Sequence, residues 1–250
     1  MVYKLHMLTW IEVKKLLDKG VSTVILPVGT IEPHGTHLTM GTDALIPESL
    51  GEILAERLDA LLLPTIYYGV TKSLYGYPGS VRVEPETLEK MIFEVLSSMV
   101  FHGFKSAIIL NGHGGSEQVI AVDRAVYRLW VEYKMPSIII EWWTLAREKG
   151  LTKDVLGKEG GHAGSDETAC ILAKYPSLVK RDLYCEKEIE VYSKGVKTYP
   201  YRGSIIHYSM DEDGIVFDKH RAEEYFGKLV DLIEKEVRRF LESLKRFDEL

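Results

Sequence analysis

The chain has 250 residues, of which 46% are hydrophobic and 27% charged, with 21 glycines and 9 prolines. This composition is typical of a globular protein and excludes collagen-like, low-complexity and disordered classes. The 31 Lys and Arg residues against 37 Asp and Glu residues give a net charge of −6, and because the two signs are interleaved, nucleic acid is excluded as the main partner.

Short β-branched runs alternate with helical patterns over the first 143 residues. The runs predict strands buried on both faces, at residues 23–28, 60–66, 106–110 and 137–140. Apolar residues with 3.6-residue spacing predict helices around and between them, at residues 9–19, 46–58, 85–102 and 117–133. Such βαβ alternation predicts an α/β fold with a largely parallel sheet and helices on both of its faces.

The second half of the chain gives weaker signals. A glycine-rich stretch at residues 157–161 precedes a predicted helix at 165–174, and residues 178–208 indicate loops with a possible hairpin. A long terminal helix is expected at residues 221–244, where Leu229, Ile233, Val237 and Leu241 form a stripe for core packing or a subunit contact. No long linker interrupts the chain, so we expect one domain over residues 1–250.

The cellular setting follows from what the sequence lacks. Cys170 and Cys185 are too few for a disulfide framework, and the first ten residues hold no cleavable apolar stretch. The longest apolar runs fall far short of the ~18 to 20 residues of a membrane span. We therefore expect a cytoplasmic protein with no membrane partner.

The first group of chemically capable residues follows the first predicted long strand, at residues 29–43. Glu32 and His34 are two positions apart, so an extended segment directs both side chains to one side. Asp43 opens the next helix and can bridge ligands or cap the helix. Ligands in open α/β sheets bind at the carboxyl edge of the strands, where this segment lies. The simpler alternative is a helix cap beside ordinary loop histidines.

Two further glycine-rich loops carry histidines. His113 lies at the centre of a loop at residues 110–116, between a predicted strand and a helix. Glycines there allow a sharp turn or an anion cradle. His162 begins a similar segment at residues 160–168, in which Asp166 and Glu167 either cap the next helix or act in a site.

The combination indicates a metal centre more specifically than any one loop. Carboxylates and imidazoles without a nearby thiol suit Zn²⁺, Mn²⁺ or Fe²⁺. Five such ligands suffice for two divalent ions that share Asp43. Water between two such ions is deprotonated near neutral pH and becomes a nucleophile. We therefore expect hydrolysis of an amide-like bond by a hydroxide that bridges two metals.

Ordered blocks of this sequence resemble the creatininase (creatinine amidohydrolase) family. The matching blocks are residues 26–38, 41–43, 111–115 and 162–168, with weaker likeness at 77–80 and 218–227. The resemblance implies a three-layer α/β/α sandwich that assembles as a homohexamer. It also implies a site for two divalent metal ions per subunit, which hydrolyses amides of a small-molecule substrate.

The resemblance also implies roles for individual residues. Glu32 and His113 would hold one metal and His34 the second, with Asp43 bridging them. His162 would be the general acid/base. The remaining expected site residues are Glu167, as a ligand of the second metal or its supporting shell, and Trp142, Trp143, Tyr77 and Ser80, around the substrate. Because neighbouring residues of a strand face opposite sides, only one of the two tryptophans is expected to face the site.

Departures from the family pattern affect the expected substrate. Creatinine-hydrolysing members carry an aromatic residue and a metal-binding glutamate where this chain has Gly114 and Gly115. The family's frequent Glu-His pair is also absent, with Ser73 and Leu74 in its place, so that wall of the pocket is altered. Glu167 is the natural replacement ligand, and creatinine is not the expected substrate. We expect a cyclic amide or a formamide.

Two alternatives stay open. One is a formamidopyrimidine nucleotide deformylase of flavin or deazaflavin synthesis, with Lys72, Arg82 or Arg202 as phosphate-binding candidates. The other is a non-catalytic metal-binding oligomeric scaffold.

Overall fold

The computed structural model describes residues 2–185, 208–209 and 214–247. Its centre is a five-stranded sheet of order β1-β3-β2-β4-β5 in which all neighbouring strands are parallel. The strands are β1 (Tyr3–Lys4), β2 (Thr23–Val28), β3 (Leu61–Leu62), β4 (Ser106–Asn111) and β5 (Ser137–Glu141). A separate antiparallel pair joins β6 (Gly161–His162) to β7 (Tyr208–Ser209). The predicted α/β class with a mostly parallel sheet is confirmed.

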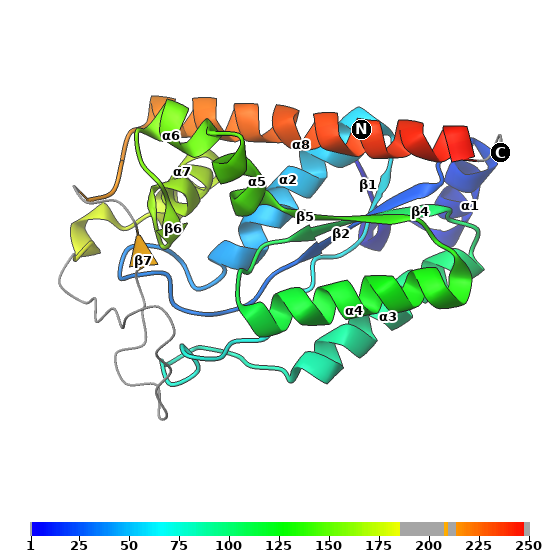
Figure 1. The fold of residues 1–250 in the computed structure, drawn as a ribbon, viewed down its shortest axis with the longest axis horizontal. Coiled ribbons are helices and arrows are strands. Elements are labelled where there is room, and N and C mark those ends of the chain that lie inside the picture. Colours follow the sequence, from blue (N-terminus) through cyan, green and yellow to red (C-terminus); the bar gives the residue numbers. More distant parts are fainter. Residues whose placement is uncertain (1, 186–207, 210–213, 248–250) are drawn as a thin grey trace.

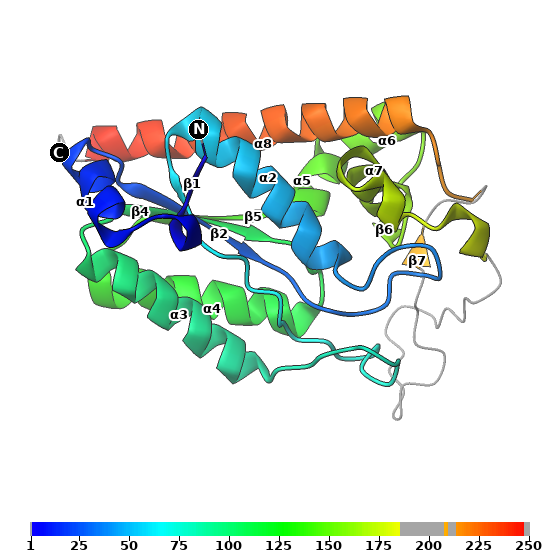
Figure 2. The same cartoon turned by 180° about the vertical axis from the view of Figure 1, so that it is seen from behind.

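Helices cover both faces of the sheet (Figures 1 and 2). One face carries α1 (Trp10–Asp18), α3 (Pro85–Phe101) and α4 (Ser116–Tyr133). The other carries α2 (Thr42–Leu58), α5 (Trp142–Glu148), α6 (Leu151–Leu156), α7 (Ser165–Lys174) and α8 (Lys219–Phe247). Short 3₁₀ helices lie at Leu5–Met7, Pro176–Leu178 and Arg181–Leu183. Each face has its own apolar core, so the molecule is the expected three-layer α/β/α sandwich.

Alternating residues of β2 explain the two cores. Ile25 packs with the α2 and α8 side, whereas Val24 and Leu26 pack with the α3 and α4 side. All three are fully buried, which accounts for the continuous apolar run in a central parallel strand. In α8, Leu229, Ile233 and Val237 are buried in the core, so for these three residues the core-packing interpretation holds.

Several element bounds differ from prediction for local reasons. The strand predicted at 60–66 is reduced to Leu61–Leu62, since Pro64 has no N–H for a ladder. Helix α2 begins at Thr42 rather than 46 and continues through Pro47. Helices α5 and α6 were not predicted. The possible hairpin at 178–208 falls mostly on residues outside the described part of the chain.

Among the described residues, no helix combines the length and apolar character that crossing a membrane requires.

Candidate active site

Two glycines bring the loops after β2 and β4 against the start of α2. A Cβ on Gly29 would lie 2.4 Å from Ala44 Cα, and one on Gly112 would lie 1.8 Å from Asp43 O. Only glycine allows such close backbone approach. The first turn of α2 is therefore wedged between the two loops, at the carboxyl edge of the sheet.

Asp43 lies at the centre of the cluster that results. Its Oδ1 is 2.9 Å from His34 Nε2, and its Oδ2 is 2.9 Å from His113 Nδ1. The residue is only 2% exposed. Although His113 is close, Oδ2 accepts no hydrogen bond in the structure. A buried carboxylate oxygen without such a bond is uncommon, and its charge favours a cation as partner.

Two more carboxylates complete the cluster. Glu32 Oε1 is 3.4 Å from His113 Nδ1 and 3.9 Å from His162 Nδ1, and Glu167 Oε2 is 3.7 Å from His34 Nε2. Three sets of these side chains have ligand atoms close enough for one metal ion. They are Glu32, Asp43 and His113; His34, Asp43 and Glu167; and Glu32, His34 and His162. The six polar residues predicted for the site are thus brought together from four chain segments.

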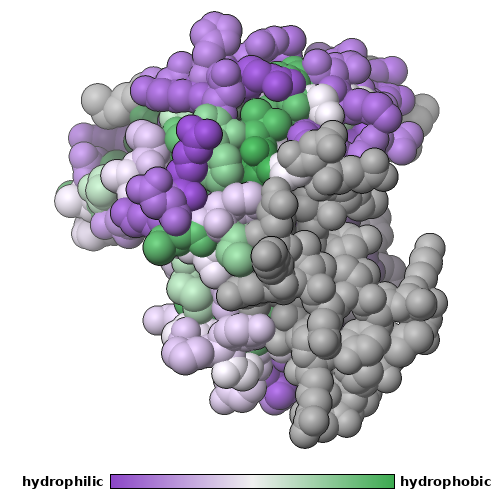
Figure 3. Space-filling model, turned by 90° about the vertical axis from the view of Figure 1, so that its left-hand side faces the viewer, coloured by the Kyte–Doolittle hydropathy of each residue, from purple (hydrophilic) through white to green (hydrophobic). Residues whose placement is uncertain are grey.

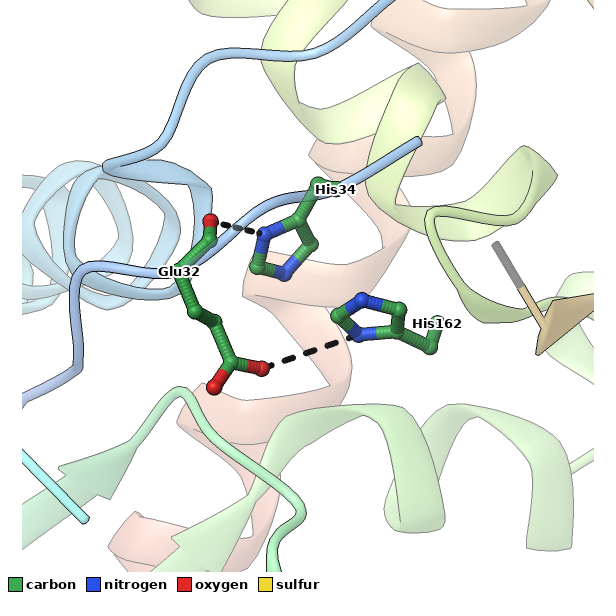
Figure 4. A group of neighbouring side chains, drawn as sticks. All are labelled: Glu32, His34 and His162. Atoms are coloured by element: carbon green, nitrogen blue, oxygen red, sulfur yellow. Dashed lines mark hydrogen bonds and ion pairs between the residues drawn. The ribbon is translucent and has the colours of Figure 1, made fainter. Parts of the chain in front are cut away.

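Backbone carbonyls orient two of the imidazoles, as Figure 4 shows for His34. His34 Nδ1 lies 3.0 Å from Glu32 O, so this nitrogen donates a proton and Nε2 faces the carboxylates. His162 Nε2 lies 2.9 Å from Pro33 O and donates likewise. Its Nδ1 is left facing Glu32 (Figure 4). Each ring therefore presents one nitrogen to the centre of the site.

Electrostatics in the cluster favour cations. Burial disfavours the charged form of His34 and His113, but the surrounding carboxylates outweigh it and raise the pKa of His34 to about 10 and that of His113 to about 9. Burial would raise the pKa of Asp43, yet the two imidazolium charges hold it well below its usual range. In the metal-free protein, protons on two rings supply the positive charge that this carboxylate needs.

Burial is the main cause of the pKa shifts of the other three groups, Glu32, Glu167 and His162. Burial raises the pKa of Glu32, and it raises that of Glu167 to about 8. Burial and the charge on His34 lower the pKa of His162 to about 3. His162 is therefore neutral at physiological pH, with its Nδ1 lone pair available. Perturbed groups gathered in one cavity are typical of a functional site.

The cluster opens into a cavity of about 490 Å³. Trp143 lines this cavity, as do Ser73 and Leu74 of the loop before α3. Figure 3 views the end of the molecule at the carboxyl ends of the strands, where hydrophobic residues gather in the middle below a hydrophilic rim.

Of the four residues expected around the substrate, Trp142, Trp143, Tyr77 and Ser80, only Trp143 lines the described cavity. Trp142 is 1% exposed and belongs to the apolar core, whereas its neighbour Trp143 faces the cavity. The expectation that only one would face the site agrees with this arrangement, although the residues lie at the start of a helix. Tyr77 and Ser80 are not among the described lining residues, and Ser80 Oγ donates to Leu74 O at 2.7 Å.

Sequence reasoning missed one charged residue of the cavity, Arg147. It follows Trp143 by four positions, one helical turn, so the two share a face of α5. The spacing could have indicated this, but only with α5 predicted. Asp166 also lines the cavity, and its Oδ1 accepts from Gly161 N and Glu167 N, both at 3.0 Å, which ties the preceding loop to the first turn of α7.

The glycine loop after β4 is shaped around its neighbours. A Cβ on Gly115 would lie 2.3 Å from His113 Nε2, and one on Gly114 would lie 3.3 Å from the Trp143 ring. The space beyond Gly115 is already filled by the imidazole ring of His113.

A family model of creatinine amidohydrolases matches residues 6–244, almost the entire chain. The chain belongs to the creatininase family. The resemblance inferred from the sequence blocks is thereby confirmed. Members of this family are hydrolases, and the site of this chain contains candidate metal-binding residues.

Curated relatives of this creatininase-family protein carry different names. It is 29% identical to creatinine amidohydrolase of Pseudomonas putida over 191 residues, which cover 70% of this chain and 73% of that protein. It is 28% identical to 3-dehydro-scyllo-inosose hydrolase of Thermotoga maritima, over 68% of this chain and 56% of that one. A pyrimidine nucleotide deformylase of Methanosphaera stadtmanae is 29% identical, over 50% of this chain and 55% of its own length.

Solved creatininases share the fold. A crystal structure of creatinine amidohydrolase (creatininase) superposes with a TM-score of 0.83 at 20% identity, covering 95% of this chain and 97% of that one. A second, a manganese creatininase, gives a TM-score of 0.81 at 22% identity, covering 96% of this chain and 98% of that one.

Proposed function

We propose that this protein is an amidohydrolase that uses two divalent metal ions to cleave a non-peptide C–N bond, in a cyclic amide or formamide of a small molecule. Its family membership and two of its relatives, an amidohydrolase and a deformylase, support hydrolysis of a C–N bond. The inosose hydrolase supports hydrolysis only, because an inosose contains no C–N bond. We further propose a homohexamer, as the family resemblance implies, and a cytoplasmic location, as expected from the low cysteine content and the N-terminal residues.

The observation that carries this proposal is the position of Asp43 between two donor sets. One set adds Glu32 and His113, the other His34 and Glu167. Each oxygen of Asp43 faces a different imidazole, which is what a bridging carboxylate needs. The buried Oδ2 without a hydrogen bond fits a cation. Nitrogen and oxygen ligands without sulfur suit Zn²⁺, Mn²⁺ or Fe²⁺.

Two divalent ions, when bound, would polarise the substrate carbonyl and supply hydroxide at neutral pH. The chain itself supplies proton transfer. His162 Nδ1 is unprotonated and faces the site, so it starts as a base. It would accept a proton as the nucleophile forms and give it to the departing nitrogen, a role worth roughly 10²- to 10⁴-fold in rate.

We propose Glu167 as the ligand that completes the second metal site. Its Oε2 lies 3.7 Å from His34 Nε2 and accepts from Ala163 N at 2.6 Å, so the carboxylate is held in place. Family members that cleave creatinine supply a glutamate at the position of Gly115. Here His113 leaves no room for a side chain at that position.

The cavity supports a small substrate other than creatinine. Its volume of about 490 Å³ suits a heterocycle, and Trp143 offers a flat apolar wall. Ser73 and Leu74 alter one wall of the pocket, and Gly114 and Gly115 replace an aromatic residue and a metal ligand of the creatinine-hydrolysing members.

The nucleotide deformylase is retained as a second candidate because Arg147 lines the cavity and could bind an anion. Lys72 and Arg82 pair instead with Glu117 and Glu84 and do not line the described cavity. Arg202 lies outside the described residues.

Elemental analysis combined with a substrate panel tests the proposal. Purified protein reloaded with Zn²⁺, Mn²⁺ or Fe²⁺ should bind close to two ions per chain and hydrolyse at least one of a set of lactams, cyclic ureas, formamides and a formamidopyrimidine nucleotide. Activity on the nucleotide alone would favour the deformylase. Metal-loaded protein that hydrolyses nothing in the panel would favour the non-catalytic scaffold.

A further inference from the structure

The outer edge of β5 has no partner strand among the described residues. β5 is the last strand of the sheet and pairs only with β4. Figure 1 shows α8 along one flank of β5 and α4 along the other. The sequence of β5, SIIIE, contains neither the proline nor the lysine with which proteins protect an exposed edge. The exposed N–H and C=O groups of such an edge can pair with a strand of another chain.

The backbone of this edge is complementary to a second copy of itself. Ala107 N donates to Pro136 O at 3.1 Å, and alternate residues of a parallel strand direct their polar groups to the same neighbour. Ser137 and Ile139 therefore direct theirs away from β4. Antiparallel pairing about a two-fold axis would place Ile139 opposite Ile139 and Ser137 opposite Glu141, at the hydrogen-bonded positions of a ladder.

Two grooves flank the edge and carry opposite charges. The groove at the start of β5, about 1290 Å³, is lined by four basic and two acidic residues: Lys105, Lys134, Arg238, Lys245, Asp123 and Glu242. The groove at its end, about 670 Å³, reverses the ratio: Asp123, Glu141, Glu148, Glu236, Lys149 and Arg239. A two-fold axis at Ile139 brings the basic groove of each copy against the acidic groove of the other. This charge complementarity favours a second copy as the occupant.

Helix α4 adds a stripe with the same symmetry. Asp123, Tyr127, Trp130 and Lys134 are spaced by four, three and four residues, so they lie on one side of the helix and its C-cap. Tyr127 is 68% and Trp130 48% exposed. Within the described residues, neither Asp123 nor Lys134 has an ion-pair partner. Antiparallel packing of two α4 helices would set Asp123 against Lys134 around an aromatic centre, a common interface pattern.

We propose that the β5 edge and the Asp123–Lys134 stripe of α4 form a two-fold interface with a second copy of this chain, which joins two sheets into one. The proposal does not depend on the catalytic one.

A charge swap measured by sedimentation and light scattering tests the interface. Each two-fold contact joins two copies, so losing it halves the particle mass. Asp123→Lys and Lys134→Glu should each weaken association by roughly tenfold or more, because like charges then meet. The double variant should restore the wild-type mass. Trp130→Asp should halve the mass, whereas the control Lys90→Glu, on α3, should leave it unchanged. Thermal unfolding verifies that each variant is folded.

Hydrogen exchange supplies a second readout. The amides of Ser137 and Ile139 should exchange slowly in the wild type and fast in Trp130→Asp, while that of Ile138, directed to β4, stays slow in both. The proposal is overturned if the wild-type particle has the 28.4 kDa mass of one chain. This holds even if the amides of Ser137 and Ile139 exchange slowly, because another segment of the same chain would then cover the edge. Single variants that dissociate over the same concentration range as the wild type in a dilution series, or a double variant that stays dissociated, overturn it too.

Discussion

The imidazole rings of His34 and His162 have centroids 4.3 Å apart, yet their pKa values move in opposite directions. Burial disfavours the charged form of both rings. Asp43 and Glu167 face His34 and raise its pKa to about 10, whereas His162 is also repelled by the charge on His34 and its pKa falls to about 3. His34 is thus held as a cation whose proton a metal ion can replace, and His162 is held as a neutral base.

This difference predicts how the stability of the metal-free protein depends on pH. In the unfolded chain His34 and His113 titrate near 6.5, but in the folded protein near 10 and 9. Between these values the folded state binds more protons than the unfolded state, so the free energy of unfolding falls as pH rises. Glu167, with a folded pKa of about 8 against 4.5, acts in the same direction between pH 4.5 and about 8. His162 acts in the opposite direction, but only below about pH 6.5.

Thermal unfolding from pH 6.5 to 10 measures this effect. The melting temperature of metal-free protein should fall across the range, while that of metal-loaded protein should change little, because cations have replaced the protons. A metal-free protein whose stability is flat or rises from pH 7 to 9 would contradict the assigned ring charges.

Substitutions at Asp43 and His162 should separate metal binding from proton transfer. Asp43→Ala removes the carboxylate shared by both donor sets, so we expect loss of bound metal and of turnover together. His162→Ala leaves both of these sets intact and should lower kcat by roughly 10²- to 10⁴-fold with unchanged metal content.

Metal analysis and kinetics on the same samples distinguish the two results. Loss of metal in His162→Ala would instead identify His162 as a ligand, as its grouping with Glu32 and His34 also allows. An Asp43→Ala protein with full activity would rule out the bridging role.

Much of the fold and the polar site was predictable from local sequence. Buried parallel strands such as β2 and β4 are continuous apolar runs, and glycines mark the loops that follow them. His113 and His162 could be placed at the sheet edge because strand ends fix where such loops emerge. The same rule groups Glu32 and Asp43 at that edge.

What was missed depends on tertiary contacts. Helix α5 starts directly where β5 ends, with no turn residue between them, so no local signal marked the boundary. The placement of Arg147 in the cavity depended on that helix. Tyr77 and Ser80 were placed by resemblance alone, and Ser80 instead holds the loop by its bond to Leu74.

The tight packing at Gly115 predicts sensitivity to the smallest side chain. Gly115→Ala would place a Cβ 2.3 Å from His113 Nε2, and His113 is confined between Asp43 and Glu32. We expect the ring to shift and metal affinity to fall by about 10- to 100-fold, as when the groups that orient a ligand are lost.

Gly76→Ala is the matched control, because a Cβ there meets nothing within 4 Å. Competition with a metal-sensitive dye gives both affinities. Equal affinities for the two variants would show that His113 moves freely or is not a ligand.

The neighbouring tryptophans should respond to substitution in different ways. Trp142 is 1% exposed and belongs to the apolar core, so Trp142→Ala should leave a cavity and lower the free energy of unfolding by about 3 to 5 kcal/mol. Trp143 lines the cavity, so Trp143→Ala should affect substrate binding, with a higher KM, more than folding. Chemical denaturation and steady-state kinetics of both variants measure the two effects. If Trp143→Ala proved as destabilising as Trp142→Ala while KM stayed unchanged, the ring would be part of the core, and the apolar wall of the cavity would have to come from elsewhere.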